Sequence, residues 1–260
     1  MESRKEKEIE YYNGRVEESL KGDKNGDFEG FKPEILSSFR FFYDWLVKNC
    51  QQKIILDYGC GNGIHSVFLA KSGAQRVIGI DLSENSLEIA RKRAEVAGFK
   101  EKIEFKMMDC EKMEFPPSFF DIIFDGGTFS SLDFKIALPE LTIVLKSDGF
   151  LIGAETLGHN PFTNLKRKIN KLTGKRTEWA ASHIFQIKDL EEAKKYFNKI
   201  ETNFFHLTSW VIFPFLGLPG AKFLLKIFET LDRILLKIPF LRKYAFKIVF
   251  IFSQPNKQYV

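Results

Sequence analysis

Short apolar runs alternate with amphipathic segments through the first 155 residues of the chain. The runs cover 53–59, 76–82, 102–109, 119–126 and 150–155, and each carries Asp or Glu at or near its end. Runs of this length and composition are typical of buried parallel strands. Helical patterns lie between them at 62–72, 83–98 and 137–145, with Ser83 and Gly98 as caps of the second and a turn before residue 150. This alternation predicts right-handed βαβ units around a parallel sheet.

The two ends of the chain extend this plan. Residues 1–30 are polar and predict an arm with at most a short helix, and 33–50 predict an amphipathic helix that begins at Pro33. A helix is expected at 188–198, a sixth strand at 199–213 and a last strand at 245–253. The predicted fold is α/β, a Rossmann-like, mostly parallel seven-stranded sheet with helices on both faces and a helical, apolar insert before the last strand. We therefore divide the chain into an arm with a helix, 1–50, and a domain, 51–260, with insertions at about 156–187 and 214–243.

Composition narrows the class of protein. The chain has 260 residues, 44% of them hydrophobic and 28% charged, as in a globular domain. The net charge is only +5, and no Lys/Arg block is interleaved with aromatics, so no nucleic-acid partner is expected. Cys50, Cys60 and Cys110 form no CxxC pair, so we expect no metal site and a reducing compartment. The charged start lacks a secretion signal, and Pro and Gly break the long uncharged stretch at 202–221, which predicts a cytoplasmic protein.

The most informative segment is the glycine-rich turn Asp57-Tyr58-Gly59-Cys60-Gly61-Asn62-Gly63 after the first strand. Glycines at a strand-to-helix turn let the backbone approach a ligand closely. The dinucleotide motif G-x-G-x-x-G would need glycine at position 64, which is Ile, and a phosphate-binding loop would need a Lys. Asp81, 18 residues after Gly63, ends the second strand, where a carboxylate can accept both hydroxyls of a ribose.

A third polar position completes the pattern. Asp109 and Cys110 end the third strand, where a side chain and a backbone N–H can reach an adenine edge. Strand ends of parallel strands share one edge of the sheet. The arrangement suits an adenosine ligand with a charged amino-acid tail.

The stretches ILDYGCGNG, GIDLS, FKMMD and FFDIIFDGG together resemble class I S-adenosylmethionine-dependent methyltransferases over about residues 50–155. The resemblance implies S-adenosylmethionine as cofactor. It implies that the glycines cradle its methionine part, that the end of the second strand holds the ribose, and that the end of the third contacts adenine. The implied cofactor-binding residues are Gly59, Gly61, Gly63, Asp81, Leu82, Asp109 and Cys110, with Asp57 near the methionine amino group, Asp125 beside the methionine tail and Tyr12 on an arm that folds over the cofactor. One departure is that GTFSSLD stands where many relatives carry a His after the fourth strand.

The acceptor side falls in the second half. Residues 154–185 resemble a subset of these methyltransferases with a G-H-N-P segment. Glu155, His159 and His183 are the predicted catalytic residues, because a neutral imidazole suits a hydroxyl or ammonium acceptor near pH 7. The alternative is that His159 only organises its loop. The predicted reaction is methyl transfer to oxygen or nitrogen of a small or amphipathic acceptor.

The insert at 214–243 is unusually apolar. Lys222, Lys226, Glu229, Arg233 and Lys237 form one polar stripe at helical spacing, and Phe, Leu and Ile cover the rest. One interpretation is a lid on its own domain or a homodimer interface. The other is an interfacial helix at the inner face of a membrane, which favours a lipid-linked acceptor. Two rival functions also stay open: a non-catalytic cofactor-binding partner subunit, and another transferase that uses the same cofactor.

Overall fold

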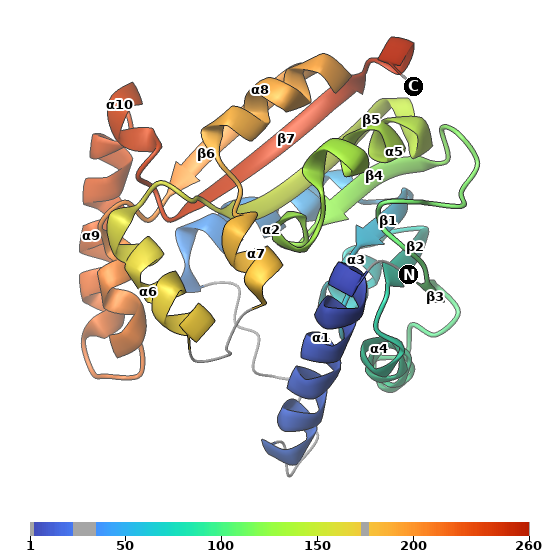
Figure 1. Ribbon diagram of the computed structural model, residues 1–260, viewed down its shortest axis with the longest axis horizontal. Helices are drawn as coiled ribbons and strands as arrows, with labels where there is room; N and C mark the ends of the chain where they lie inside the picture. The colour runs from blue at the N-terminus through green and yellow to red at the C-terminus, as the bar shows by residue number, and fades with distance from the viewer. Residues whose placement is uncertain (1–2, 23–34, 173–176, 260) are drawn as a thin grey trace.

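A single sheet organises the protein. The computed structural model describes residues 3–22, 35–172 and 177–259, and its seven strands run in the order β3-β2-β1-β4-β5-β7-β6 (Figure 1). The strands are β1 (Ile54–Tyr58), β2 (Arg76–Asp81), β3 (Ile103–Met107), β4 (Phe120–Asp125), β5 (Leu145–Thr156), β6 (Phe197–Phe205) and β7 (Lys247–Pro255). Strands β1 to β5 pair in parallel, and β7 is antiparallel to both of its neighbours. The predicted Rossmann-like, mostly parallel seven-stranded fold is confirmed.

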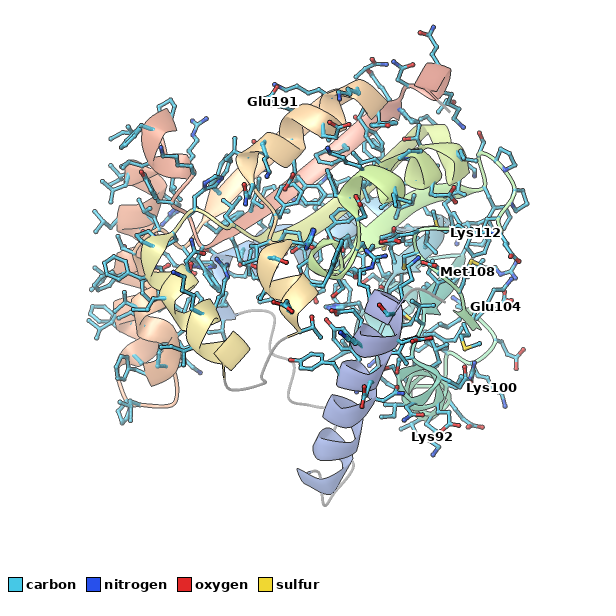
Figure 2. The ribbon with its side chains drawn as sticks, viewed as in Figure 1. Lys92, Lys100, Glu104, Met108, Lys112 and Glu191 are labelled. Carbon is cyan, nitrogen blue, oxygen red and sulfur yellow. The ribbon has the colours of Figure 1, made fainter. Side chains whose placement is uncertain are left out.

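Helices cover both faces of this sheet. They are α1 (Ser3–Gly22), α2 (Ser37–Asn49), α3 (Ile64–Lys71), α4 (Glu84–Val96), α5 (Phe134–Val144), α6 (Pro161–Leu172), α7 (Glu178–Ser182), α8 (Ile187–Tyr196), α9 (Ala221–Leu235) and α10 (Pro239–Arg242), with 3-10 turns η3 (Phe129–Ser131), η4 (Ser209–Phe215) and η5 (Lys257–Tyr259). Buried residues of α2, α3 and α4 pack on one face, and those of α5 and α8 pack on the other. The described chain has no helix between β3 and β4, where Met108 and Lys112 lie on a connecting loop (Figure 2).

Helix α2 is part of the core rather than of a separate arm. Phe42 and Leu46 are fully buried, and the ring of Phe42 lies 4.8 Å from that of Phe124 on the central strand β4. The apolar positions of this helix recur every three or four residues, so one stripe meets the sheet. The predicted start of this helix, at Pro33, lies outside the described residues.

Two expected boundaries differ from the structure. Strand β5 begins at Leu145, directly after α5, so residues before 150 that were expected to form a turn belong to the strand. The pairing of β5 with β4 is irregular there, because its register shifts between Phe120 and Ile122 of β4. The expected sixth strand ends at Phe205, because His206 has a positive φ of 62° and its ring is held by Ser38 and Ser209. The segment after it forms η4 instead of extended chain.

The N-terminal region also differs from its prediction. Residues 3–22 form one continuous 20-residue helix, α1, which lies beside α4 (Figure 1). Its hydrogen bonds to loops at the strand ends, described below, stabilise a sequence whose own composition is too polar to indicate a long helix. Within the described residues, none of the helices combines the length and the apolar character needed to cross a membrane.

Candidate active site

A pocket of about 450 Å³ opens at the carboxyl ends of β1, β2 and β4, and α1 closes part of it. Such a position is where open α/β sheets bind ligands, and the volume lies within the range of small-molecule sites. Four stretches of chain and one helix line it: Lys5, Glu8, Ile9 and Tyr12; Gly59 to Asn62 with Ile64 and His65; Asp81 to Ser83 with Ser86; Cys110; and Gly126 to Thr128 with Ser131 and Leu132.

The glycine turn forms the floor of this pocket. Gly59, Gly61 and Gly63 all have positive φ, in the region that favours glycine. A Cβ on Gly59 would lie 2.4 Å from the Thr128 side chain, and one on Gly63 would lie 2.7 Å from Cβ of Ala90. Gly59 and Gly61 face the pocket, whereas Gly63 allows the turn to pack against α4. Close packing therefore requires glycine at positions 59 and 63, whereas at Gly61 the positive φ alone favours it.

Asp81 ends β2 at the wall of the pocket. Its carboxylate accepts hydrogen bonds from the backbone N–H of Gly61 and of Ser83, both at 2.9 Å. Burial raises the pKa of this carboxyl, and those backbone hydrogen bonds partly offset the rise. The side chain thus ties two loops together and, with Leu82 beside it, faces the cavity at the place expected for a ribose.

The end of β3 is arranged differently from its prediction. Cys110 lines the pocket, and its carbonyl accepts a hydrogen bond from the Tyr58 hydroxyl at 2.8 Å. Asp109 does not line the pocket, because Lys5 of α1 reaches its carboxylate at 2.6 Å. An adenine edge would meet the Cys110 backbone directly.

Asp57 and Asp125 also lie behind the pocket wall rather than in it. The Ser66 hydroxyl donates to Asp57 at 2.5 Å, which fixes the start of α3 to the end of β1. Asp125 accepts the backbone N–H of Thr128 at 2.8 Å and of Gly127 at 3.2 Å, which shapes the turn after β4. These two carboxylates shape the turns after β1 and β4, and their place beside the methionine part stays a prediction.

The buried Asp57 predicts a pH-dependent stability. Burial raises its pKa to about 7, while the Ser66 hydrogen bond lowers it in part. The unfolded chain ionises near 3.8, so between these values the folded state holds the extra proton and stability falls as the pH rises. We expect Asp57→Asn to be more stable relative to wild type at pH 8 than at pH 5, measured by thermal unfolding without ligand.

Asp121 supplies the matched control for this prediction. It accepts hydrogen bonds from Lys146 and from the backbone of Ile54, and these partners lower its pKa against the opposing effect of burial. A lowered pKa means that its stabilisation is fully present above 3.8, so the cost of Asp121→Asn should be the same at pH 5 and pH 8. Equal pH trends for the two variants would contradict the assignment of Asp57.

Helix α1 contributes one face to the pocket. Lys5, Glu8, Ile9 and Tyr12 line it at positions i, i+3, i+4 and i+7, the spacing of one helical stripe. The Tyr12 hydroxyl lies 3.2 Å from the Ser131 hydroxyl, so Tyr12 reaches the pocket as predicted. Lys5, Glu8 and Ile9, which line the pocket beside it, are not among the predicted site residues. These four residues have helical spacing, but they mix charged and apolar side chains, so the hydrophobic pattern of the sequence does not predict their common face.

His65 was also missed. It lines the pocket at the start of α3, and its Nδ1 lies 2.7 Å from the Tyr43 hydroxyl. Burial, together with the positive charges of Lys247 and Arg93, lowers its pKa to about 4, so the imidazole is neutral at pH 7. All four histidines of the chain lie in the described residues, and among them only His65 lines the pocket.

The three predicted catalytic residues do not converge on this pocket. His159 accepts the backbone N–H of Ile187 at 3.2 Å, and His183 stacks on Trp179 with ring centroids 3.5 Å apart at the surface. Glu155 is buried behind η3, where it accepts the Phe129 N–H at 2.8 Å. Burial raises the pKa of Glu155 to about 8, and the neighbouring Asp125 raises it further. These side chains organise loops and the buried end of β5, and none of them lines the pocket, so their catalytic role stays a prediction.

Part of the chain that forms this site is similar to known proteins. Residues 55–149 match a family described as a methyltransferase domain. An uncharacterised protein of Haemophilus influenzae is 30% identical over 154 residues, 55% of this chain and 61% of its own length. Phosphoethanolamine N-methyltransferase 3 of Arabidopsis thaliana is 37% identical over 103 residues, 40% of this chain and 20% of its own length. The chain thus spans less than two thirds of these curated relatives.

The fold resembles that of a solved methyltransferase. Haemonchus contortus phosphoethanolamine N-methyltransferase 2, solved with phosphomonomethylethanolamine and S-adenosylhomocysteine, superposes with a TM-score of 0.59 at 18% identity. The match covers 82% of this chain and 52% of that one. The family match spans the segment from β1 through the turn before the middle of β5, so it contains the glycine turn, Asp81 and Cys110. Residues 55–149 are thus similar to a methyltransferase domain, and the predicted bounds of the domain, 51–260, stay a prediction.

Proposed function

We propose that this chain, which contains a methyltransferase domain, is an S-adenosylmethionine-dependent methyltransferase acting on oxygen or nitrogen of a small or amphipathic acceptor. The observation that carries this proposal is the pocket in which the glycine turn, the Asp81 carboxylate and the Cys110 backbone face one cavity. An open floor without Cβ atoms, a carboxylate and a backbone edge suit the methionine, ribose and adenine parts of the cofactor respectively. When bound, S-adenosylmethionine supplies an activated methyl group on a sulfonium.

The residues of this chain would act mainly by positioning. Gly59 and Gly61 let the backbone approach the ligand, Asp81 orients it, and α1 covers it through Tyr12 and Lys5. Methyl transfer is an in-line displacement, so alignment of the two reactants supplies most of the acceleration. None of Glu155, His159 and His183 lines the pocket, which favours a mechanism that does not depend on them as bases.

The acceptor is proposed to enter beside η3 and α7. Ser131 of η3 lines the pocket in the segment where many relatives carry a His, and α7 packs against η3. The Arg4 guanidinium lies 4.4 Å from the ring centre of Trp179, which links α7 to the helix that covers the pocket. The G-H-N-P segment supports this side of the domain indirectly, because Asn160 caps α6 and donates to the Tyr244 carbonyl at 2.9 Å.

Calorimetry and product analysis test this function. We expect micromolar binding of S-adenosylmethionine, comparable or tighter binding of S-adenosylhomocysteine, and none of NAD. Incubation with cofactor labelled in the methyl group, a lipid extract and a small-molecule extract should then yield labelled product, identified by mass spectrometry. Binding without any transfer would favour the partner-subunit alternative, and transfer of another group would favour a different transferase. Absence of cofactor binding by folded protein would overturn the proposal.

A further inference from the structure

Helix α9 buries two carboxylates and leaves most of its large apolar side chains exposed. Its four buried residues are Ala221, Leu225, Glu229 and Asp232, of which the two carboxylates are only 6% and 3% exposed. On the opposite side Phe223 is 68% exposed and Ile234 is 60% exposed. A surface helix of a globular protein has the reverse arrangement. Most of the large apolar side chains of α9 are therefore not buried against its own domain, as the interpretation of the insert as a lid would require.

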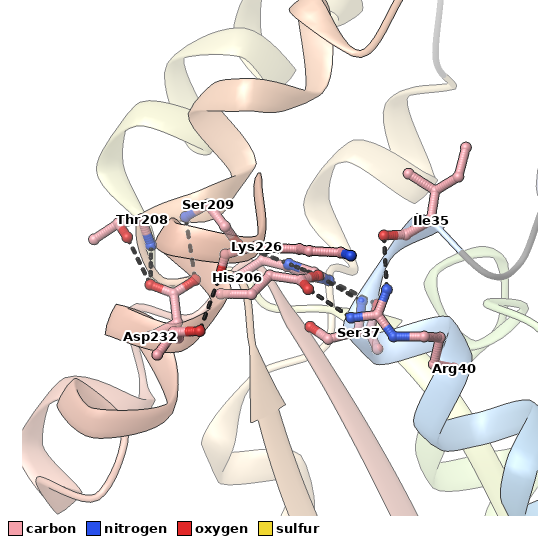
Figure 3. A network of polar contacts seen from close by, with 11 residues as sticks. Ile35, Ser37, Arg40, His206, Thr208, Ser209, Lys226 and Asp232 are labelled. Carbon is pink, nitrogen blue, oxygen red and sulfur yellow. Dashed lines mark hydrogen bonds and ion pairs between the residues drawn. The ribbon is translucent and has the colours of Figure 1, made fainter. Parts of the chain in front are cut away.

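Specific bonds fix this orientation. Glu229 accepts hydrogen bonds from Arg40 of α2 and from the backbone of Ser37, both at 2.6 Å. Asp232 accepts the Thr208 N–H at 2.8 Å, the Thr208 hydroxyl at 2.7 Å and the Ser209 N–H at 3.1 Å. Figure 3 shows Asp232 facing Thr208 and Ser209, with Arg40 reaching across from α2. Turning the helix over would break every one of these bonds, so its apolar side is held outward.

Helix α6 repeats the arrangement. Its inward residues include Thr163 and Arg167, which are 5% and 8% exposed, and Arg167 donates to Asn164 at 2.7 Å. The ring of Phe162 lies 6.2 Å from Trp210 of η4, which joins α6 to the same surface. Helices α6, α9 and α10 gather at the end of the molecule opposite α4 (Figure 1). Two helices with inverted polarity at one end indicate a common partner.

The apolar side chains concentrate in this region. Of the 18 large hydrophobic side chains exposed in the described chain, 13 lie between residues 162 and 240. They are Phe162, Leu165, Ile169, Val211, Phe215, Leu218, Phe223, Leu224, Ile227, Leu231, Ile234, Ile238 and Phe240. Single exposed apolar residues are ordinary, but a concentration on a few adjoining elements marks an interaction surface. We name this set the outer apolar surface.

The side chains around the outer apolar surface are mainly basic, which favours an anionic partner. Residues 210–243 contain six Lys or Arg and two acids, and both acids, Glu229 and Asp232, are buried. Residues 157–172 contain no acid. We propose that the outer apolar surface binds an anionic lipid bilayer, with Phe and Leu side chains at the acyl boundary and the basic side chains at the headgroups. A second copy of this chain fits less well, because a symmetric contact would bring two basic rims together.

Vesicle co-sedimentation tests the lipid surface. We expect binding to vesicles that contain phosphatidylglycerol, weaker binding to phosphatidylcholine alone, and a decrease with added salt. Replacing Phe223 and Phe240 together by Ser should reduce binding about tenfold or more, because both rings lose their burial in lipid. The matched control replaces Val96 and Met107 by Ser, since both are exposed and lie on α4 and β3.

Several outcomes would overturn this proposal. Folded wild-type protein that fails to bind anionic vesicles at low salt would exclude it. An equal loss in the Val96 and Met107 control would show that the effect is not local. A dimer in analytical ultracentrifugation that dissociates in the Phe223 and Phe240 variant, without vesicle binding, would assign the surface to a second copy instead.

A second observation concerns the pocket itself. Glu8 lines the pocket and is 7% exposed, yet neither of its carboxylate oxygens has a hydrogen-bond partner among the described residues. Two polar residues near Glu8 on α1 have partners: Lys5 contacts Asp109, and Asn13 accepts from the Ser83 hydroxyl at 2.6 Å. Burying a carboxylate without a partner is costly. A ligand that supplies a cation or donors would remove this cost.

The helix places Glu8 on the acceptor side of the pocket. Residues four apart share a face of a helix. Four residues before Glu8, Arg4 lies over Trp179 of α7, and four residues after it, Tyr12 contacts Ser131 of η3. Asn13, on the neighbouring stripe of α1, contacts Ser83, which lies beside Asp81 and the proposed ribose position. Glu8 thus faces η3 and α7.

We infer that Glu8 binds a cationic or amine nitrogen of the acceptor, which makes nitrogen the methylated atom; this inference rests on the proposed function. An ammonium acceptor first releases one proton to solvent; the neutral amine nitrogen then gives its lone pair to the methyl carbon, and the carbon–sulfur bond breaks with its electron pair on sulfur. The positive charge moves from sulfur to the methylated nitrogen, which keeps its protons until solvent removes one. A buried carboxylate beside that nitrogen stabilises the charge as it forms.

Matched amines and alcohols test the role of Glu8. With S-adenosylhomocysteine bound, wild type should bind alkylamines from ethyl to octyl about tenfold or more tighter than the corresponding alcohols, and Glu8→Gln should remove this preference. The affinity of Glu8→Gln for S-adenosylhomocysteine should stay near wild type. The control is Glu6→Gln, an exposed acid on the same helix, which should leave the preference unchanged.

The two proposals about the pocket fail in different ways. Wild type that binds no S-adenosylhomocysteine would overturn the proposed function. Wild type that binds the cofactor but takes amines and alcohols equally would overturn only the role of Glu8. Loss of cofactor affinity in Glu8→Gln would assign this carboxylate to the cofactor instead of the acceptor.

Discussion

Asp81→Ala should lower the affinity for S-adenosylmethionine by about 2–4 kcal/mol, or roughly 30- to 1000-fold. Under the proposed function this carboxylate of the pocket wall accepts both ribose hydroxyls, and charge-assisted hydrogen bonds are the strongest of their kind. It also accepts the N–H groups of Gly61 and Ser83, so its removal loosens two loops that line the pocket. Isothermal calorimetry of the variant against wild type measures the loss.

Two further variants separate the ligand effect from the loop effect. Asp81→Asn keeps an acceptor oxygen for one backbone N–H, so its thermal stability without ligand should stay closer to wild type while its cofactor affinity is still reduced. Glu88→Ala removes an exposed acid from α4 and should change neither quantity. Unaltered cofactor affinity in Asp81→Ala would remove Asp81 from the binding site.

Gly59→Ala should have the second large effect, on both folding and binding. Gly59 has a φ of 68°, and a Cβ there would lie 2.4 Å from both Cγ2 and Oγ1 of Thr128. The left-handed conformation costs an L-residue about 1–2 kcal/mol, and forcing an extra methyl into a packed site costs about 1–3 kcal/mol more. Thr128 would have to give up its hydrogen bond to the Tyr58 carbonyl, now at 2.9 Å. We expect a loss of about 2–5 kcal/mol in the free energy of unfolding, with cofactor affinity reduced at least about tenfold.

Gly98→Ala is the control for this prediction. Its φ of 77° imposes the same backbone cost, but nothing lies within 4 Å of the Cβ position, and the residue follows α4 away from the pocket. It should lose only the backbone part of the stability and none of the cofactor affinity. If chemical denaturation gave the same loss for both glycines, the contact with Thr128 would not be the cause.

The sequence by itself determined the sheet and half of the pocket. Apolar runs of strand length, separated by helical patterns, leave few topologies open, because parallel strands need crossover helices of one hand. The turn from Asp57 to Gly63 and the acid at Asp81 were located to the residue, since both lie at fixed places relative to strands β1 and β2. Local chemistry of this kind is written in consecutive positions, so it needs no knowledge of distant packing.

Other assignments depended on which segments meet across the chain. His159 and His183 have residue types suited to catalysis, yet the folded chain places them against Ile187 and Trp179. His65 is not among the residues predicted for the site, yet it lines the pocket. A side chain's chemistry is readable from its type, but its surroundings come from loops whose path no periodic pattern describes.

Only the tertiary structure decided the orientation of α1 and α9. The stripe of Glu8 and Tyr12 faces the pocket because Lys5 and Asn13 are bonded to loops after β3 and β2, more than 60 residues away in the sequence. The periodicity of α9 predicted two unlike faces but not which one turns inward, and its apolar face alone would favour the inward position. The bonds of Glu229 to Arg40 and of Asp232 to Thr208 reverse that preference. A buried carboxylate is costly without partners, so contacts between distant segments, rather than hydrophobicity, set which side of this helix meets the protein.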